Sequence, residues 1–465
     1  MTAERTKGDP RAGAVDRPTR TVTLTGWGRI MPTTAELVEP ASDADAAALL
    51  RDATLVIPRG LGRSYNNAAQ TAGGLVLSTA RLNRVIALDP ATGLADCEAG
   101  TSLEQLMTAG LPHGWFVPVS PGTRQVTIGG AIAADVHGKN HHRAGSFAGH
   151  VRQLSLLLPS GELRTVTPEG DPELFWATAG GMGLTGLVTR ATVQLTRVGS
   201  SLLGVDTVRT ADIEETMRVL TEHDATHGYT VAWSDSMATG GSTGRSIVTS
   251  GDFVAVGDLP ASARDRPFHF DPRPKLAVPD LFPRGLLNRC SIRLANEIWY
   301  RKTPKSRHGE LQTISQFFHP LDVVSNWNRV YGPGGFRQYQ YVLPFGEEAA
   351  VRRSFEIISA HPAPSFVTVL KRFGGADPGL LSFPRPGWTL ALDFPGRTPA
   401  LLPLLDRLDR LVLEHGGRVY LAKDSHVARS AFEAMYPQVE EFRRIRAAID
   451  PGRVFASDLS RRLSL

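Results

Sequence analysis

The most chemically informative stretch of the sequence is residues 117–142, VPVSPGTRQVTIGGAIAADVHGKNHH. Its glycines lie among small and β-branched residues, and Asp135 is its only acid. Because glycine adds nothing to a core and costs conformational entropy, such a run is typical of turns or of backbone amides that face an anion. Thr127 adds a hydroxyl donor, and His137 and Lys139 follow the apolar run. The stretch predicts a cradle for an anionic ligand; the alternative is a glycine-rich loop between core elements.

A second glycine-rich loop lies earlier in the chain, at 58–67, with the sequence PRGLGRSYNN. It follows Leu55, Val56 and Ile57, which predict a strand. Two glycines, two arginines and a serine suit a diphosphate that is held by N–H groups and flanked by cations. The chain therefore contains two candidate anion cradles.

A lysine follows an apolar strand-like segment near the end of the chain, at Lys423. Partial burial at such a position lowers the pKa of a lysine, which prepares it to transfer a proton or to hold an anion. The alternative is a lysine that merely forms an ion pair with Asp424.

The sequence GMGLTG at 181–186 fits the dinucleotide-binding pattern G-x-G-x-x-G, and Asp206 lies twenty residues beyond it. That pattern must follow a strand and open a helix. Here residues 174–179 predict a helix and residues 187–198 alternate as a strand. We therefore reject a Rossmann fold and expect a helix-to-strand turn near the bound ligand.

Short strands and short helices alternate from residue 21 to about residue 198, which predicts an α+β domain that positions these loops. The sequence TSLE at 101–104 is interpreted as a capping box whose helix is closed by Gly110. Asp171 followed by Pro172 predicts another helix start.

A second domain is expected from about residue 199, where the pattern of predicted helices and strands changes. Residues 212–223 predict a helix, and residues 336–343 and 388–394 predict strands. Residues 432–449 predict an amphipathic helix near the C-terminus.

The segment 261–308 has an unusual composition, with eleven Lys or Arg, four acids and six prolines among scattered large apolar residues. Such a segment suits a mobile lid or a membrane-surface segment. The alternative is a solvated, disordered loop. Nucleic-acid binding is not supported, because no nucleic-acid-binding motif accompanies the basic residues.

The overall composition excludes several other classes of protein. The 465 residues are 42% hydrophobic and 21% charged, which predicts a soluble globular protein with two domains or one large insertion. No apolar run approaches the ~18 residues of a membrane-spanning helix. Cys97 and Cys290 lack metal-ligand spacing, so neither a zinc site nor a disulfide framework is expected. Residues 1–20 predict a disordered tail without a Sec or twin-arginine signal.

In their order along the chain, these motifs resemble the FAD-dependent oxidases of the vanillyl-alcohol oxidase, or PCMH-type, superfamily. Four motifs spread over almost the whole chain carry the resemblance: PRGLGRSYNN at 58–67, PGTRQVTIGGAIAADVHGKN at 121–140, GGMGLTG at 180–186 and DPGRVF at 450–455. The resemblance implies an α+β, two-domain fold. Residues 21–200 and 418–465 would hold FAD, and residues 201–417, built on an antiparallel sheet with a flexible lid at about 261–308, would bind substrate.

Five further motifs are similar to the branch of this superfamily that acts on a polyprenyl-phosphoryl ribose: HGKNHH at 137–142, QYQYVLPF at 338–345, LKRFG at 370–374, YLAKDS at 420–425 and FASDLSRRL at 455–463. This similarity implies oxidation of the ribose 2-hydroxyl to a ketone. A separate NADH-dependent reductase subunit would then reduce the ketone, which completes an epimerisation for cell-wall arabinan synthesis. It also implies a peripheral position at the plasma membrane, a membrane surface as partner, no nucleic acid and no metal.

The resemblance assigns roles to individual residues. Lys423 and His137 are the candidate catalytic residues, because hydride transfer from a sugar carbon to a flavin requires a base for the hydroxyl proton. The residues implied to bind substrate are Tyr65, Gln340, Lys371, Phe373, Ala391 and Lys423. The residues implied to hold FAD are Pro58, Arg59, Gly60, Leu61, Gly62, Arg63, Ser64, Tyr65, Asn66, Asn67, Ala68, Gly122, Thr127, Ile128, Gly129, Gly130, Ala134, Asp135, Val136, His137, Val188 and Tyr420.

The chain departs from similar enzymes at several of these positions. Arg63 stands where many relatives carry a histidine bonded covalently to the flavin, so we expect non-covalent FAD. Ala391 stands where similar enzymes have the cysteine to which covalent nitroaromatic inhibitors attach, so we expect no such trapping. Asn66 and Asn67 replace a Gly-Asp pair, and YLAK at 420–423 keeps only the lysine of the HWGK motif of aldonolactone oxidases.

Two other functions stay open at this point. One is an oxygen-using oxidase of free alditols or aldonolactones, whose water-soluble substrate would not explain the composition of the lid. The other is a membrane-peripheral scaffold that binds FAD only as a structural element. The presence of both Lys423 and His137 argues against the scaffold.

Overall fold

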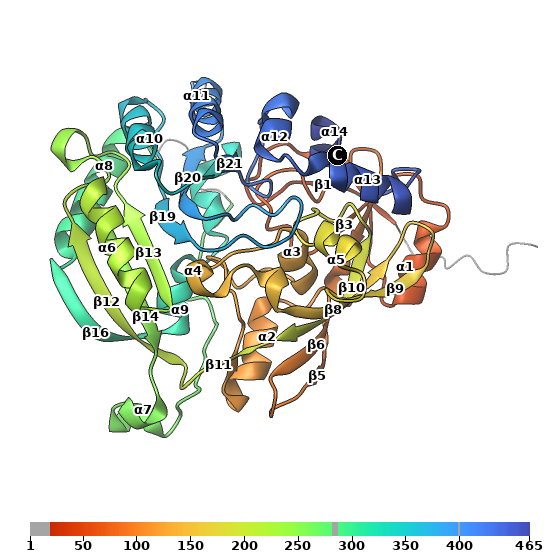
Figure 1. Ribbon diagram of the computed structural model, residues 1–465, viewed down its shortest axis with the longest axis horizontal. Coiled ribbons are helices and arrows are strands. Elements are labelled where there is room, and N and C mark those ends of the chain that lie inside the picture. Colours follow the sequence, from red (N-terminus) through yellow and green to blue (C-terminus); the bar gives the residue numbers. More distant parts are fainter. Residues whose placement is uncertain (1–18, 281–286, 399) are drawn as a thin grey trace, which may run out of the picture.

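The computed structural model describes residues 19–280, 287–398 and 400–465 (Figure 1). Nearly all of the predicted tail and a short part of the predicted lid lie outside these described residues.

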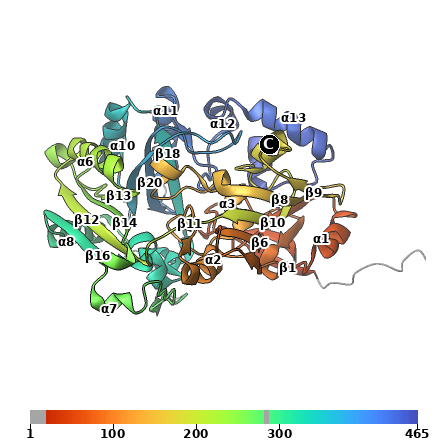
Figure 2. The same cartoon turned by 60° about the horizontal axis from the view of Figure 1, so that its bottom comes forward.

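Two sheets come from the first part of the chain. The first has the order β1-β2-β4-β3, with β1 antiparallel to β2 and the remaining neighbours parallel; its strands are β1 (Arg20–Leu24), β2 (Thr33–Val38), β3 (Val56–Arg59) and β4 (Leu75–Ser78). The second is antiparallel, with the order β5-β6-β10-β8-β9; its strands are β5 (Val85–Leu88), β6 (Leu94–Glu98), β8 (Val151–Leu157), β9 (Leu163–Val166) and β10 (Leu187–Gln194). Figures 1 and 2 show both sheets on the right of the molecule.

A larger antiparallel sheet lies on the left in both views, in the order β16-β12-β14-β13-β19-β20-β18-β21. Its strands are β12 (Leu202–Thr210), β13 (Tyr229–Ser234), β14 (Ser246–Phe253), β16 (Ser306–Thr313), β18 (Phe336–Leu343), β19 (Thr368–Phe373), β20 (Gly387–Pro395) and β21 (Arg418–Val419). The expected antiparallel sheet is therefore confirmed. Two short pairs complete the strands of the described residues: β7 (Trp115–Phe116) with β11 (Thr196–Arg197), and β15 (Leu276–Ala277) with β17 (Val324–Ser325).

The two faces of the large sheet have different surroundings, as strand β18 shows. Successive side chains of a strand point to opposite faces. Tyr339 and Tyr341 point to the helical side, where their hydroxyls bond to Asp409 of α11 (Leu401–Glu414) and Ser354 of α10 (Glu348–Ala360). Gln338 and Gln340 point to the other face and line a cavity. One face of the sheet therefore belongs to the core and the other to a site.

Helices α6 (Ile213–Thr226), α10 (Glu348–Ala360) and α11 (Leu401–Glu414) pack on the large sheet. The others are α1 (Asp43–Leu50), α2 (Leu103–Gly110), α3 (Ile128–Ala133), α4 (His141–Ala144), α5 (Pro172–Thr178), α7 (Ala261–Arg264), α8 (Arg289–Lys302), α9 (Ile314–Phe318), α12 (Arg429–Met435), α13 (Val439–Ile449) and α14 (Asp458–Leu463).

Two predicted helix boundaries were wrong. The N-cap of α2 is Ser102, whose capping box uses Gln105 in place of the expected Thr101 and Glu104. The chain then continues past Gly110 into a 3-10 turn. The helix expected over 432–449 is split into α12 and α13 because Pro437 cannot continue an α-helix. The start of α5 at Asp171 and Pro172 is confirmed.

The glycine motif at 181–186 follows α5 and precedes β10, which confirms the helix-to-strand turn and the rejection of a Rossmann fold. Met182 and Gly183 have positive φ angles of 55° and 76°, so the turn uses the left-handed region that favours glycine. No helix within the described ranges combines the length and the apolar character needed to cross a bilayer.

The C-terminal residues return to the first part of the chain. A β-bridge joins Val56 to Phe455, and the Tyr65 amide donates to the Ala422 carbonyl over 3.0 Å. These contacts bring Lys423 to the loop that follows β3.

Candidate functional site

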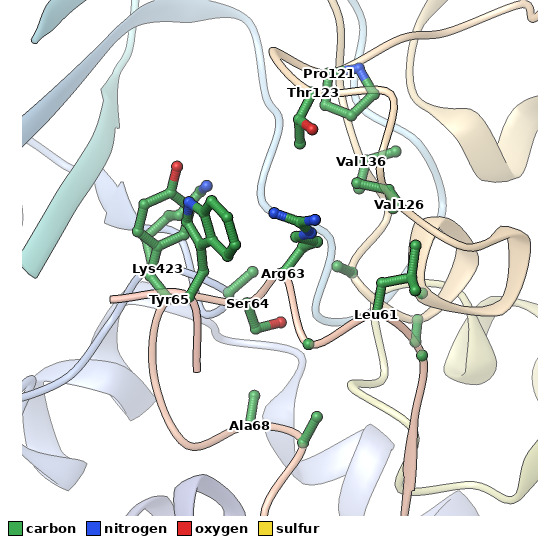
Figure 3. A pocket seen from close by; sticks show the side chains of 18 of the residues that line it. Leu61, Arg63, Ser64, Tyr65, Ala68, Pro121, Thr123, Val126, Val136 and Lys423 are labelled. Carbon is green, nitrogen blue, oxygen red and sulfur yellow. The ribbon is translucent and has the colours of Figure 1, made fainter. Parts of the chain in front are cut away.

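A cavity of about 300 Å³ lies where the loop after β3, the start of α3 and the inner face of the large sheet meet. Figure 3 shows the side chains of its wall, with Arg63 extending into the space between Ser64 on one side and Val126 and Thr123 on the other. Segments from the beginning, middle and end of the chain therefore form one site.

The two glycine-rich loops contact each other at the base of this cavity. A Cβ atom at Gly60 would lie 2.2 Å from the Thr127 hydroxyl oxygen, so only glycine fits there. That hydroxyl is the N-cap of α3, where it accepts a hydrogen bond of 3.1 Å from the Gly130 amide. Gly122 also lines the cavity, and a Cβ at Gly122 would meet no protein atom within 4 Å. The first loop is thus locked onto α3, and Gly122 leaves space beside it.

Arg63 is a cation held at the cavity wall. Its guanidinium lies 3.9 Å from the ring centroid of Trp27, a cation–π contact. Its Nε is buried and has no hydrogen-bond partner among the described residues. Burial lowers the pKa of Arg63, which the negative charge of Asp322 partly offsets. A buried donor without a partner is costly, so this arginine is suited to an anionic ligand.

His137 follows α3 and faces the large sheet. The side-chain amide nitrogen of Gln340 lies 2.9 Å from its Nε2 and 3.1 Å from the Thr389 hydroxyl. An amide nitrogen only donates, so Nε2 of His137 is the acceptor and the ring proton is assigned to Nδ1. Burial, followed by the nearby Lys371, holds the pKa of His137 well below its usual value. The imidazole is therefore neutral, with one nitrogen occupied by Gln340.

Lys423 lies on the same wall, held by a bond of 2.9 Å from its backbone amide to the Tyr420 carbonyl. Its Nζ is 3.6 Å from the ring centroid of Tyr65, and both residues line the cavity. Burial lowers the pKa of Lys423 to about 7, the Asp393 carboxylate opposes that effect, and Lys371 adds to it. An amine with this pKa is in part uncharged at neutral pH and can accept a proton.

Asp393 is a functional candidate that the sequence analysis missed. It comes from β20 and lines the cavity, and it is 1% exposed. Gln338 donates to its Oδ1, while its Oδ2 is buried and has no hydrogen-bond partner among the described residues. Burial raises the pKa of Asp393 to about 7, although Gln338 and Lys423 act in the opposite direction. The alternation of β20, with Asp393 two residues after Ala391, was the signal that could have identified it.

The cavity wall contains most of the residues assigned from the sequence. Those that line it are Pro58, Gly60, Leu61, Gly62, Arg63, Ser64, Tyr65, Ala68, Gly122, Thr127, Gly129, Gly130, Ala134, Val136, His137, Val188, Gln340, Lys371, Ala391, Tyr420 and Lys423. Six assigned residues are not part of the wall: Arg59, Asn66, Asn67, Ile128, Asp135 and Phe373.

The residues outside the wall support it from behind. Asn66 donates to the Leu421 carbonyl over 2.7 Å, which ties the first loop to the segment before Lys423. Arg59 donates to the carbonyls of Thr25 and Ala69 over 2.7 and 3.0 Å. Phe373 packs edge-on against His137 with ring centroids 4.7 Å apart.

The wall also contains residues to which the sequence analysis gave no binding or catalytic role, although several of them lie within the motifs quoted above. Besides Asp393, they are Trp27, Ala69, Thr79, Pro121, Thr123, Val126, Ala133, Thr178, Met182, Gly183, Gly186, Leu187, Leu321, Trp327, Gln338, Val367, Val369 and Ala422. The alternation of β18 could have indicated Gln338, whereas Trp27 and Trp327 meet only through the tertiary fold, with ring centroids 5.9 Å apart.

The groups on the cavity wall suit a dinucleotide cofactor, independently of any resemblance to other proteins. Exposed backbone at Gly60 and Gly122, the unpaired donor of Arg63 and the hydroxyl of Thr127 provide donors along one cavity. The adjoining face of the large sheet provides Gln340 and Lys371. An anionic, partly apolar ligand matches this combination of groups.

Comparison with known proteins agrees with the geometry. A family model described as FAD binding domain matches residues 34–167, and one described as D-arabinono-1,4-lactone oxidase matches residues 396–463. These two matches cover the segments that form the glycine loops and the wall around Lys423. The cofactor is therefore FAD.

Relatives extend the likeness to nearly the whole chain. The decaprenylphosphoryl-beta-D-ribose oxidase of Mycolicibacterium smegmatis is 44% identical over 458 residues, 96% of this chain and 98% of that protein. An uncharacterized protein in the mprA 5' region of Streptomyces coelicolor is 41% identical over 373 residues, 78% of this chain and 100% of that protein. Cytokinin dehydrogenase 6 of Oryza sativa subsp. japonica is 29% identical over 195 residues, 39% of this chain and 37% of that protein. The chain thus belongs to the PCMH-type superfamily of FAD-dependent oxidoreductases, in the family of the M. smegmatis oxidase.

Proposed function

We propose that this enzyme oxidises the 2-hydroxyl of decaprenylphosphoryl-β-D-ribose, or of a similar polyprenyl-phosphoryl ribose, to a ketone. The observation that carries the proposal is the position of Lys423. Its amine lies against Tyr65 on the wall of the cavity that the glycine loops also line, with a pKa lowered to about 7. The similarity to the M. smegmatis oxidase over 96% of the chain supports the choice of substrate.

The chemistry divides between the cofactor and the protein. Bound FAD supplies the acceptor for the hydride that leaves carbon 2 of the sugar. Lys423 accepts the proton of the 2-hydroxyl as the carbon–oxygen double bond forms. Lys371 and Gln340 bind and orient the sugar from β19 and β18. His137 supports Gln340 and is not itself the base, because its Nε2 is occupied and its pKa is lowered.

The remaining assignments of the sequence analysis are part of this proposal. The loop 58–68 and the start of α3 hold FAD without a covalent bond, since Arg63 cannot form one. Residues 21–200 and 418–465 make up the FAD domain, and 201–417 the substrate domain. A separate NADH-dependent reductase reduces the ketone to complete an epimerisation that supplies the arabinose donor for cell-wall arabinan. The enzyme works peripherally at the plasma membrane, where its lipid-linked substrate is located.

The test of this proposal is to identify the product. The protein is incubated with a polyprenyl-phosphoryl ribose and an artificial electron acceptor, and the product is then reduced with sodium borodeuteride. If the product is a 2-ketone, this reduction places deuterium at carbon 2 and gives a mixture of ribose and arabinose products. Deuterium at another carbon, or none with this substrate but turnover of a free alditol or aldonolactone, would refute the proposed reaction.

Lys423→Ala in the same assay distinguishes an enzyme from a scaffold. We expect the rate to fall by roughly 100-fold to 10,000-fold, the usual contribution of a positioned base. Flavin content should be retained, which would show that the substitution removed a catalytic group and not the fold. An unchanged rate would refute the role of Lys423.

A further inference from the structure

Helix α8 (Arg289–Lys302) leaves three large apolar side chains exposed, although its Ile292 is buried. Leu294, Ile298 and Trp299 are 62%, 58% and 54% exposed. A surface helix of a globular protein normally buries its apolar stripe and exposes its polar face. Helix α8 buries Ile292 and Asn296 but leaves these three apolar side chains in contact with solvent, and exposed apolar side chains of this kind mark a contact with a partner or a membrane.

Polar side chains next to the buried Ile292 hold α8 to the protein. Asn296 donates to Asp235 over 2.8 Å, and the Tyr300 hydroxyl donates to the Thr210 carbonyl over 3.0 Å. Arg245 bridges Asp235 and Glu297, with 2.6 Å to each carboxylate. These bonds fix the rotation of the helix, so the exposure of its apolar face is a property of the folded protein.

Cations surround the apolar face. Arg293, Lys302 and Lys305 are exposed, and none of them forms an ion pair with an acidic residue among those described. Projected at 100° per residue, Arg293 and Lys302 lie on opposite sides of the stripe that Leu294 and Ile298 form. On the same projection Trp299 lies about 100° from Ile298, at the edge of this stripe and next to the buried Ile292. A helix with an exposed Leu and Ile stripe, an exposed Trp at its edge and unpaired cations on both sides is typical of helices that lie in the interface of an anionic bilayer.

The N-terminal end of α8 is joined to the wall of the cavity. Leu287, one residue before the N-cap, packs against the cluster of Trp327, Tyr331 and Phe336, as do Trp27 and Leu321. Trp27, Trp327 and Leu321 also line the cavity. A surface bound by α8 would therefore lie close to this side of the site.

We propose that the exposed face of α8 docks on the surface of an anionic phospholipid bilayer. Leu294, Ile298 and Trp299 enter the headgroup and acyl boundary, and Arg293, Lys302 and Lys305 lie at the anionic headgroups. This inference deepens the proposed function and rests on it, because a lipid-linked substrate is available only to an enzyme at the bilayer. Helix α8 is the element that brings the cavity there.

The test is sedimentation of the FAD-loaded protein with vesicles of phosphatidylglycerol mixed with phosphatidylcholine. The variant carries Leu294→Ser, Ile298→Ser and Trp299→Ser together. Its matched control replaces three exposed leucines on other elements, Leu163→Ser, Leu402→Ser and Leu413→Ser. We expect the wild type and the control to sediment with the vesicles, and the vesicle affinity of the α8 variant to fall at least tenfold. Equal sedimentation of all three proteins, or no binding by the wild type, would overturn the proposal.

A second variant keeps the apolar face and removes charge: Arg293→Gln, Lys302→Gln and Lys305→Gln. Its affinity should fall by about fivefold per removed cation on the anionic vesicles, and should change little on pure phosphatidylcholine. A face that instead joins two copies of the chain would give a dimer in solution that the Leu294, Ile298 and Trp299 replacements convert to a monomer. That result, without a change in vesicle binding, would contradict the proposal.

Failure of the docking inference is separable from failure of the proposed function. Polyprenyl-phosphoryl ribose presented in detergent micelles should bleach the flavin equally in the wild type and in the α8 variant. Bleaching in micelles with unchanged vesicle binding in the α8 variant would refute the docking role alone. Vesicle binding that depends on α8, without bleaching by the lipid-linked sugar, would refute the proposed substrate alone.

Discussion

In the mechanism that we propose, the reaction depends on the protonation of one amine. Uncharged Lys423 is the form that would accept the hydroxyl proton, and burial lowers its pKa to about 7 against the opposing charge of Asp393. The rate of anaerobic flavin reduction at saturating substrate should therefore rise with pH around 7 and level off above it.

Two substitutions should move this pH dependence in opposite directions. Asp393→Asn removes a negative charge that stabilises the ammonium of Lys423, so the pKa should fall and the rising part of the profile should shift to lower pH. Lys371→Met removes a positive charge that destabilises the ammonium of Lys423, so the pKa of Lys423 should rise and the profile should shift to higher pH. Stopped-flow flavin absorption over a pH series measures both shifts. Shifts of the same sign, or none, would show that Lys423 is not the titrating base.

Ala391 defines a second prediction at the level of single residues. It lies on β20 in the cavity wall, opposite Gln340 of β18 and Val369 of β19. We expect no intact-mass shift when the wild type is turned over in the presence of a covalent nitroaromatic inhibitor, because no thiol is offered there. Ala391→Cys should restore a one-to-one adduct with little loss of turnover. An adduct on the wild type would refute this assignment.

At the scale of elements, the contact between the first glycine loop and α3 decides whether the cofactor cradle forms. Thr127→Ala removes the hydroxyl that caps α3, which should lower the free energy of unfolding by about 1 kcal/mol. Thr127→Ser keeps that hydroxyl and should retain most of the stability. Thermal or denaturant unfolding of the two variants measures the difference. Equal loss in both would show that the methyl group, and not the cap, stabilises this contact.

Gly122 tests the space beside that contact. A Cβ at Gly122 meets no protein atom, so Gly122→Ala should leave the unfolding transition of the FAD-free protein unchanged. It should nevertheless weaken FAD binding, because the methyl group would occupy the cavity in which we propose that the cofactor binds. Gly257→Ala is the matched control, since its Cβ also meets open space but lies outside the cavity. Equal FAD affinity in both variants would place the cofactor elsewhere.

Local sequence patterns predicted many of these elements and failed where tertiary contacts decide. The start of α5 was predictable because Asp171 and Pro172 act within one turn of the helix. The division between α12 and α13 was missed because the apolar periodicity continues across Pro437. The exposure of Leu294, Ile298 and Trp299 could not be predicted from the residues of α8 alone. Bonds that α8 makes to Arg245 and to the Thr210 carbonyl, both distant in sequence, select the face that packs.

At the scale of the whole molecule, the site exists only in the assembled fold. The loop after β3, the turn that carries Lys423 and the inner face of the large sheet are far apart in the chain, and the bonds from Tyr65 to Ala422 and from Asn66 to Leu421 join the first two. Recurring motifs predicted Lys423 and the glycine loops. Asp393 was missed although the alternation of β20 places it on the same face as Ala391, whereas Trp27 is recognisable only by its neighbours in space.

The most direct test of the central claim is anaerobic mixing of the FAD-loaded protein with a polyprenyl-phosphoryl ribose, and separately with a free alditol or aldonolactone, while the flavin absorption is followed. We predict bleaching by the lipid-linked ribose alone, with a rate that depends on Lys423. Bleaching only by the water-soluble sugars would contradict the proposed substrate, and no bleaching by either would contradict the proposed oxidation.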